Sequence, residues 1–464
     1  MKRNCLKIFV VFWMLTMVLG THIKNVSAVS DPRNQPNNKV CVGILSPETD
    51  VVEAAAMVNA KSDWGYVVVV IKVDERNVDR WQGILNQMSK KHIIPIFRIA
   101  TIFDSSGNWQ KPGVNDADEW ADFFSKLYFP TKNKYIQVYN EVNRAGEWGG
   151  HVDPAEYAAE LSKTIDALKD KGDDFFLLNA PLDLALATSS DSMDAGRYFD
   201  LMEEARHGIF AKLDGWASHS YPNPNFSASP EKSGRLGIDG YNWELAQVEK
   251  YLGGKNLSVF ITETGWKRSE LLDENQIAEY FAKAFSEVWS DSRIASVCPF
   301  VFNYPDPLFN QFSFKTDSKV LGRTYYNYYY KIQDLSKIVG SPTRDNLLSD
   351  LNLSFPQFVI RDQMKTVFFT FKNSGNFIWN AREGLSLNVA ADGVFVLNKH
   401  WGQDEVYPGQ EASVEISIVS SKTGDIPVVI SLFDRDQKLS EKEVFVKSET
   451  RWARLIRIVT ALIS

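Results

Sequence analysis

Two glutamates stand at the ends of apolar segments, and together they suggest one particular chemistry. Glu141 follows Asn140 after the run "YIQVY" (135–139), and Glu263 follows the run "LSVFIT" (257–262). Two carboxyl groups beside a glycosidic bond can cleave it, because one protonates the leaving oxygen while the other attacks the anomeric carbon or activates water. An Asn-Glu dipeptide alone is usually a helix start or a solvated loop, so the surrounding elements must decide its interpretation.

The chain from residue 39 to about 337 alternates strand-like and helix-like segments. Apolar runs without a polar face indicate strands that are buried on both sides, as in parallel sheets. The eight runs are residues 40–45, 66–73, 93–100, 135–141, 175–181, 213–221, 257–263 and 295–304. Helix-like segments follow six of them, at residues 50–60, 78–92, 116–129, 153–172, 273–291 and 323–337.

This alternation predicts an α/β fold, a closed (β/α)8 TIM barrel over residues 39–338. An open doubly wound sheet is the alternative. Such a sheet usually carries a glycine-rich phosphate-binding turn after its first strand, and "GILSPET" (43–49) is not one.

In a TIM barrel the active site lies at the carboxyl ends of the strands. The polar residues at these ends, in strand order, are Arg98, Asn140, Glu141, Asn179, His219, Tyr221, Glu263, Asn303 and Tyr304. Glu141 and Glu263 would therefore face each other across one barrel mouth. Ionisation of either carboxyl group disfavours ionisation of the other, which separates their pKa values.

Three motifs at these strand ends resemble the retaining glycoside hydrolases of clan A. They are "YNE" (139–141), "SHSYPNP" (218–224) and "ITETGW" (261–266). The resemblance implies that Glu141 is the acid/base, that Glu263 is the nucleophile, and that no metal or organic cofactor is needed. It also implies roles in substrate binding for Asn140 at the sugar 2-hydroxyl, Tyr221 at the nucleophile, His219 in the same network and Arg98, more loosely, beside the nucleophile.

The sequence departs from the clan pattern in one aromatic position. Many members carry a tryptophan at the end of strand eight as the floor of the sugar site, and "VFNYPDPLFNQF" (301–312) has none. Phe302 or Tyr304 could replace it, or Trp266 could supply the platform from strand seven. Trp109, Trp148 and Trp266 follow strands three, four and seven, where they could stack on sugar rings or simply cover the barrel.

The pattern of apolar and polar residues changes after about residue 345. Short alternating runs separated by turn signals predict an antiparallel β-sandwich over residues 347–448, with a linker at 340–346. Trp379 and the Pro408-Gly409 pair resemble the Ig-like domain first described in autophagy receptors. The resemblance implies an accessory module for spacing, docking or weak glycan contact.

The two ends of the sequence predict contacts outside the globular domains. Residues 1–28 combine a basic start, an apolar run and "VSA" (26–28), which predicts a signal peptide and a secreted or cell-surface protein. An uncleaved membrane anchor is the alternative. Without their four basic residues the net charge of −7 becomes −11, which makes nucleic acid an unexpected partner.

Residues 451–464 place apolar side chains at helical spacing beside Arg451, Arg454 and Arg457. This pattern predicts a basic amphipathic helix that is too short to span a bilayer. It either docks on the sandwich or contacts a membrane surface.

Cysteine and histidine placement argues against a metal or redox function. No HExxH or CxxC motif occurs, and the six histidines do not cluster. Cys5 precedes the apolar run of the leader, whereas Cys41 and Cys298 lie on strands one and eight, which are neighbours in a closed barrel. Neighbouring strands place their Cα atoms about as far apart as a disulfide requires, but we favour two buried free thiols.

These observations together predict a secreted retaining glycoside hydrolase that acts on β-linked polysaccharides or oligosaccharides. An exported carbohydrate-binding or adhesion protein with a catalytically weak barrel is one alternative. A transglycosylase that uses the same site is another, since it differs only in whether water or a sugar accepts the glycosyl group.

Overall fold

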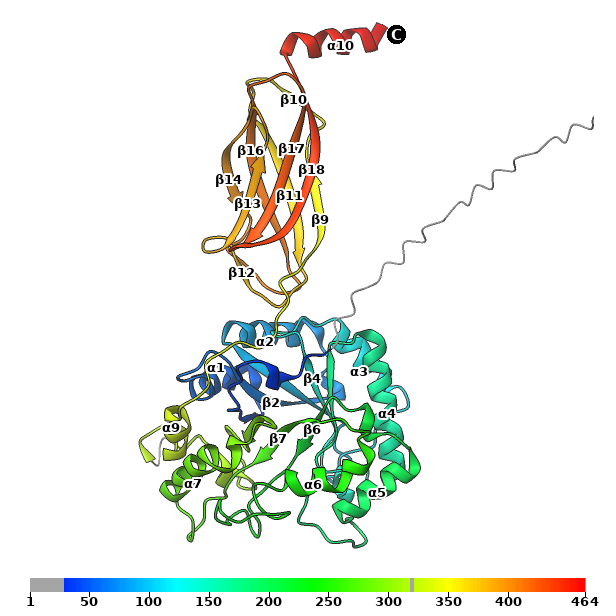
Figure 1. Ribbon diagram of the computed structural model, residues 1–464, viewed down its shortest axis with the longest axis vertical. Helices are drawn as coiled ribbons and strands as arrows, with labels where there is room; N and C mark the ends of the chain where they lie inside the picture. Colours follow the sequence, from blue (N-terminus) through cyan, green and yellow to red (C-terminus); the bar gives the residue numbers. More distant parts are fainter. Residues whose placement is uncertain (1–28, 318–320, 464) are drawn as a thin grey trace, which may run out of the picture.

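Eight parallel strands form the first sheet of the protein (Figure 1). The computed structural model describes residues 29–317 and 321–463, so the predicted signal peptide lies outside the described residues. Each strand pairs with the next one along the chain, in the order β1 to β8. The strands are β1 (Gly43–Ile44), β2 (Gly65–Lys72), β3 (Ile93–Ala100), β4 (Lys134–Val138), β5 (Phe175–Leu178), β6 (Gly215–Ser218), β7 (Ser258–Thr264) and β8 (Ile294–Pro299). Each overlaps one predicted apolar run, which confirms the (β/α)8 prediction.

The barrel closes between its first and last strands. Val40 bridges Val297 in parallel, and the Cys41 amide N–H donates to the Val297 carbonyl at 3.0 Å. Cys41 and Cys298 are joined by a disulfide beside this bridge, with their Cα atoms 4.3 Å apart. Our preference for two free thiols was therefore wrong, because ring closure brings strands one and eight close enough for the bond.

Helices surround the sheet and bury its outer face (Figure 1). They are α1 (Pro47–Val58), α2 (Val78–Lys90), α3 (Asp116–Ser125), α4 (Pro154–Lys171), α5 (Ala195–Ala205), α6 (Tyr241–Val248), α7 (Glu274–Ser286) and α9 (Asn327–Asp334). The Asp153 carboxylate accepts from the Glu156 amide N–H, and Pro154 occupies the first turn, which explains where α4 begins. The sequence did not predict α5 and α6. The eight residues of α6 are too few to show a helical period.

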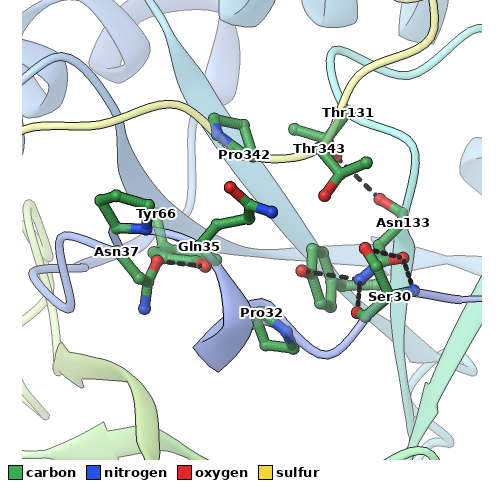
Figure 2. A pocket seen from close by; sticks show the side chains of 11 residues that line it. Ser30, Pro32, Gln35, Asn37, Tyr66, Thr131, Asn133, Pro342 and Thr343 are labelled. Carbon is green, nitrogen blue, oxygen red and sulfur yellow. Dashed lines mark hydrogen bonds between the residues drawn. The ribbon is translucent and has the colours of Figure 1, made fainter.

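A hollow at the amino end of the barrel is lined by residues that lie far apart in the sequence (Figure 2). Tyr66, at the start of β2, donates its hydroxyl to Asn37 Oδ1 at 2.7 Å, and Asn133 donates to the Tyr135 hydroxyl oxygen at 3.0 Å. The remaining lining residues are Ser30, Pro32, Gln35, Pro36, Thr131, Pro342 and Thr343. This hollow lies at the opposite end of the strands from Glu141 and Glu263, so it does not belong to their site.

The second domain is a β-sandwich of two four-stranded sheets, as predicted. One sheet has the order β10 (Phe358–Ile360), β18 (Gln437–Glu449), β17 (Gly424–Asp434) and β13 (Leu385–Ala390). The other has the order β14 (Val394–Trp401), β16 (Glu411–Ser420), β11 (Lys365–Asn373) and β9 (Leu348–Ser354). A small pair, β12 (Trp379–Asn380) and β15 (Glu405–Val406), adds to the end nearest the barrel (Figure 1). Trp379 is completely buried in the core of this domain.

The sandwich packs against the amino ends of the barrel strands. Asn376 donates its side-chain amide to the carbonyls of Phe129 and Thr131, which precede β4, at 3.0 and 3.2 Å. The Arg344 guanidinium lies between the rings of Trp64 and Phe377, at 4.9 and 4.0 Å from their centroids. The carboxyl ends of the strands, where Glu141 and Glu263 lie, therefore face away from the sandwich (Figure 1).

The last described helix, α10 (Arg451–Ile463), follows β18 at the end of the sandwich that is remote from the barrel (Figure 1). Among residues 29–317 and 321–463, no helix combines the length and the apolar character that crossing a bilayer requires.

Candidate active site

The loop after β4 holds the first catalytic candidate. We predicted a strand that reaches Glu141, but β4 ends at Val138. The chain turns there, because Tyr139 and Glu141 have φ values of 68° and 34°, a region that residues other than glycine rarely occupy. The Glu141 amide N–H donates to the Pro181 carbonyl at 2.9 Å, which fixes the turn. Such conformations persist where the surroundings impose them, and they concentrate at active sites.

Three predicted residues, in the loop after β4, directly after β6 and on β7, meet at the barrel mouth. Glu263 lies on β7, and one of its carboxylate oxygens is within 4.8 Å of a Glu141 carboxylate oxygen. His219, directly after β6, places Nδ1 at 2.9 Å from Glu141 Oε1 and at 3.7 Å from Glu263 Oε2. The imidazole is buried. The two carboxyl groups are thus near neighbours that share one histidine.

Two further predicted residues hold Glu263. The Tyr221 hydroxyl donates to Glu263 Oε2 at 3.1 Å, and the Arg98 guanidinium donates to Oε1 at 3.3 Å. Burial, together with the adjacent Glu263 charge, holds the pKa of Tyr221 far above its ordinary value. The phenol therefore stays a donor, and both oxygens of Glu263 are oriented by the protein.

Glu141 and His219 influence each other's protonation. Burial alone would raise the pKa of Glu141, but the hydrogen bond and charge of His219, with the charges of Arg144 and Arg98, outweigh it and lower the pKa. Burial alone would lower the pKa of His219, but Glu263 and Glu141 outweigh it and raise the pKa. His219 Nε2 has no hydrogen-bond partner among the described residues. The contact between Nδ1 and Glu141 Oε1 is therefore the one through which this pair can exchange a proton.

Asn140 and three residues that the sequence did not identify complete the polar surface. The Asn140 side chain donates to Glu147 Oε2 at 3.4 Å, and the Arg98 guanidinium is 3.7 Å from the same oxygen. Burial raises the pKa of Glu147 to about 7, against the opposing charge of Arg98. Arg144 lies 3.4 Å from Glu141 Oε2 and 3.5 Å from Asp183. Arg144 and Glu147 lie within six residues of Glu141, so a search of the loop after strand four would have found them.

The structure does not bring the predicted tryptophan platforms into the site. Trp148 is completely buried and donates its indole N–H to Glu156 at 2.9 Å. Trp266 is buried as well, donates to the Ala228 carbonyl at 2.8 Å, and packs on Phe281. Phe302 is buried in the main hydrophobic core. These side chains stabilise the barrel instead of facing a ligand.

Other aromatic rings lie nearer to the polar residues. Trp109 lines a small hollow with Arg98, Asn140 and Glu147, and its ring lies 4.0 Å from that of the exposed Phe103. Tyr304 is half-buried and contacts Phe300, and Phe312 connects Phe300 to Tyr221. Trp109 is therefore a better candidate for a sugar-stacking ring than Trp148 or Trp266.

Glu141, His219 and Glu263 also present three atoms with the spacing of metal ligands. Arg98 and Tyr221 already contact both oxygens of Glu263, and Arg144 lies beside Glu141. Positive guanidinium groups at both carboxylates disfavour a cation between them. A second set, His151, Asp153 and Glu156, is similarly engaged, because Glu156 pairs with Lys111 at 2.7 Å and Asp153 caps α4.

Comparison with known proteins gives structural neighbours only. No family model matches the chain, and no curated protein matches it. A family 39 glycoside hydrolase from Bacteroides cellulosilyticus WH2 aligns with a TM-score of 0.46 and 13% identity over 84% of this chain and 83% of its own. A β-mannanase from Streptomyces thermolilacinus aligns with a TM-score of 0.40 and 13% identity over 64% of this chain and 90% of its own. A GH5-4 broad specificity endoglucanase from an uncultured bovine rumen ciliate aligns with a TM-score of 0.36 and 15% identity over 60% of this chain and 84% of its own. These neighbours are glycoside hydrolases, but similarity this low carries no inference about activity, so function must be inferred from the site itself.

Proposed function

We propose that the protein is a retaining glycoside hydrolase that cleaves β-linked polysaccharides or oligosaccharides. The observation that carries the proposal is the approach of Glu141 and Glu263 to within 4.8 Å, oxygen to oxygen. Retaining enzymes keep their carboxyl groups about 5–5.5 Å apart, whereas inverting enzymes need about 6.5–9.5 Å to admit a water molecule. An approach this close supports direct attack by one of the two carboxylates.

The contacts of each carboxylate divide the two roles. Glu263, oriented by Tyr221 and Arg98, attacks the anomeric carbon and forms an ester with the sugar. Glu141 protonates the departing oxygen as the glycosidic bond breaks. Water then replaces the leaving group, Glu141 removes a proton from it, and the resulting hydroxide cleaves the ester with net retention.

Asn140 is suited to bind the substrate beside these groups. Its side-chain Oδ1 is buried and has no hydrogen-bond partner among the described residues, while its amide N–H donates to Glu147. A buried acceptor without a donor is costly to leave unpaired. A sugar hydroxyl that donates to Oδ1 would satisfy it, which supports the role that we expected for Asn140 at the 2-hydroxyl.

The remaining domains fit an exported enzyme. Disulfides such as Cys41–Cys298 persist in oxidising compartments, which supports the interpretation of residues 1–28 as a signal peptide. We propose the sandwich as an accessory module of the Ig-like kind, on the resemblance carried by Trp379 and by Gly409, whose φ is 83°.

The direct test of the proposed function is product analysis. The protein should release sugars from at least one of a panel of β-glucans, mannans, xylans and galactans. Proton NMR of the first product should show the β anomer before mutarotation. Early appearance of the α anomer would contradict direct attack by Glu263. Binding of a polymer without cleavage would favour a carbohydrate-binding protein instead.

The His219–Glu141 pair predicts a change in pH dependence. In the native protein the catalytic proton is retained until the pH exceeds the raised pKa of His219, so this pKa sets the basic limb. In His219→Gln the proton depends on Glu141 alone, whose ordinary pKa lies about 2 units below that of histidine. Because burial raises the pKa of Glu141 once His219 is gone, we expect the basic limb of kcat/KM to move toward acid by less than this difference.

Tyr221→Phe is the matched control for this measurement, because it removes a hydrogen bond to Glu263 and leaves the His219–Glu141 contact in place. It should lower kcat without moving the basic limb. An unchanged limb in His219→Gln would show that the pair does not hold the catalytic proton.

A further inference from the structure

The helix α10 presents an uncovered apolar face. Its apolar side chains Trp452, Leu455, Ile456, Val459 and Leu462 are between 46% and 81% exposed. At 3.6 residues per turn they occupy an arc of roughly 120° on one side of the helix. The sequence left open whether this helix docks on the sandwich, and the structure shows that its apolar face does not.

All the charge of α10 lies outside this arc, on the part of the helix that also carries Ala453, Ile458, Thr460 and Ala461. Arg451, Arg454 and Arg457 are the only charged residues of the helix. Arg457 lies 4.2 Å above the ring of Phe358 and 3.2 Å from Glu449, so this arginine holds the helix to the sandwich. The apolar side chains are left exposed at the end of the molecule that is remote from the barrel (Figure 1).

The charge of the helix contrasts with that of the chain that carries it. The full sequence has a net charge of −7, and without the three arginines of α10 this becomes −10. Any attraction of the protein to an anionic surface must therefore begin at a local basic element. A second copy of α10 is a poor partner, because neither helix offers an acidic residue to pair with the arginines of the other.

We propose that α10 docks on the surface of a lipid bilayer that contains anionic lipids. Its 13 residues span only about 20 Å, less than the roughly 30 Å of a hydrocarbon core, so the helix would lie in the interface. The apolar arc enters the boundary between headgroups and acyl chains, and Arg451 and Arg454 contact lipid phosphates. The proposal does not depend on the catalytic activity of the barrel.

Vesicle cosedimentation tests the proposal. All proteins begin at Val29, where the described structure begins, so that the apolar run of the leader contributes nothing to binding. The unsubstituted protein should sediment with phosphatidylglycerol–phosphatidylcholine vesicles and much less with pure phosphatidylcholine, and added salt should weaken the binding. Absence of binding to the anionic vesicles would overturn the proposal.

Two double variants separate the contributions of the two faces. Arg451→Gln with Arg454→Gln should weaken binding about 25-fold, at roughly fivefold per arginine. Leu455→Gln with Val459→Gln should weaken it roughly 100-fold, because two apolar side chains no longer favour insertion. Glutamine preserves helix propensity, so neither variant removes the helix itself.

Matched controls place the same changes elsewhere on the sandwich. Arg382→Gln with Lys442→Gln lowers the net charge by the same two units, and Phe395→Gln with Leu397→Gln removes two exposed apolar side chains from β14. Both control proteins should bind as the unsubstituted protein does. Loss of binding in the β14 control, or concentration-dependent association through α10 without vesicle binding, would assign the contact to another surface or to a second copy.

Discussion

Glu263→Gln is expected to lower kcat by about 10⁴-fold or more while the protein stays folded. The amide cannot attack the anomeric carbon, so no glycosyl ester forms. Its oxygen still accepts from the Tyr221 hydroxyl, which is why the fold should tolerate the change. The measurement is steady-state hydrolysis of the best substrate from the glycan panel, together with thermal unfolding.

The control for this variant is substrate binding. Glu263→Gln should retain affinity for the glycan, since Asn140 and the aromatic rings around Arg98 are unchanged. A variant that keeps more than a few per cent of native activity, or one that has lost its unfolding transition, would remove the support for a nucleophilic role.

Glu141→Gln is expected to show a loss that depends on the leaving group. Losing a positioned general acid and base costs about 10²–10⁴-fold when the leaving group needs a proton. An aryl glycoside with an acidic phenol leaves without this help, so the first step should survive. The second step then slows because no base activates water. The glycosyl enzyme accumulates, and the phenol released in the first step appears as a burst.

Azide distinguishes the two steps in this variant. As an anionic nucleophile it needs no general base, so it should restore turnover of the activated substrate by forming a β-glycosyl azide. Azide should have no such effect on Glu263→Gln. Failure of azide to restore turnover in Glu141→Gln, with the burst also absent, would contradict the acid/base role.

Glu147 is a second carboxyl group near the site that could act as the acid in place of Glu141. Burial raises the pKa of Glu147 to about 7, so this carboxyl group is partly protonated near neutrality. Judged by pKa alone it is the readier acid, because His219 lowers the pKa of Glu141. Judged by geometry Glu141 is favoured, because it is the carboxylate next to Glu263 and His219. Glu147→Gln should therefore show neither the leaving-group dependence nor the azide effect.

The sequence predicted the barrel because its signal is repetitive. Eight buried parallel strands each need a continuous apolar run, and residues 93–100 show that pattern without ambiguity. Where a strand ends is a weaker signal. β4 stops at Val138 since Tyr139 and Glu141 adopt left-handed backbone conformations, and no side-chain pattern announces such a turn.

The sequence predicted the position of the carboxylate pair but not that of the tryptophans, for a physical reason. Glu141 and Glu263 are polar residues after apolar strands, so the fold itself directs them to the mouth. Trp148 and Trp266 satisfy both solvent-free packing and an indole hydrogen bond inside the protein, which a sequence does not distinguish from stacking on a ligand. The Cys41–Cys298 bond was likewise missed, because sequence places both cysteines on adjacent strands but does not set their oxidation state.

The attachment of the sandwich to the amino ends of the barrel strands determines the direction from which a substrate can reach Glu141 and Glu263. β18 alone extends about 40 Å at 3.3 Å per residue, and α10 follows it at the far end. A protein held through α10 would stand upright, with the face that carries Glu141 and Glu263 turned outward and separated from its support by the sandwich and the depth of the barrel. Short sugars attached to that support would be out of reach, whereas polymers arriving from outside would meet Glu141 and Glu263 first.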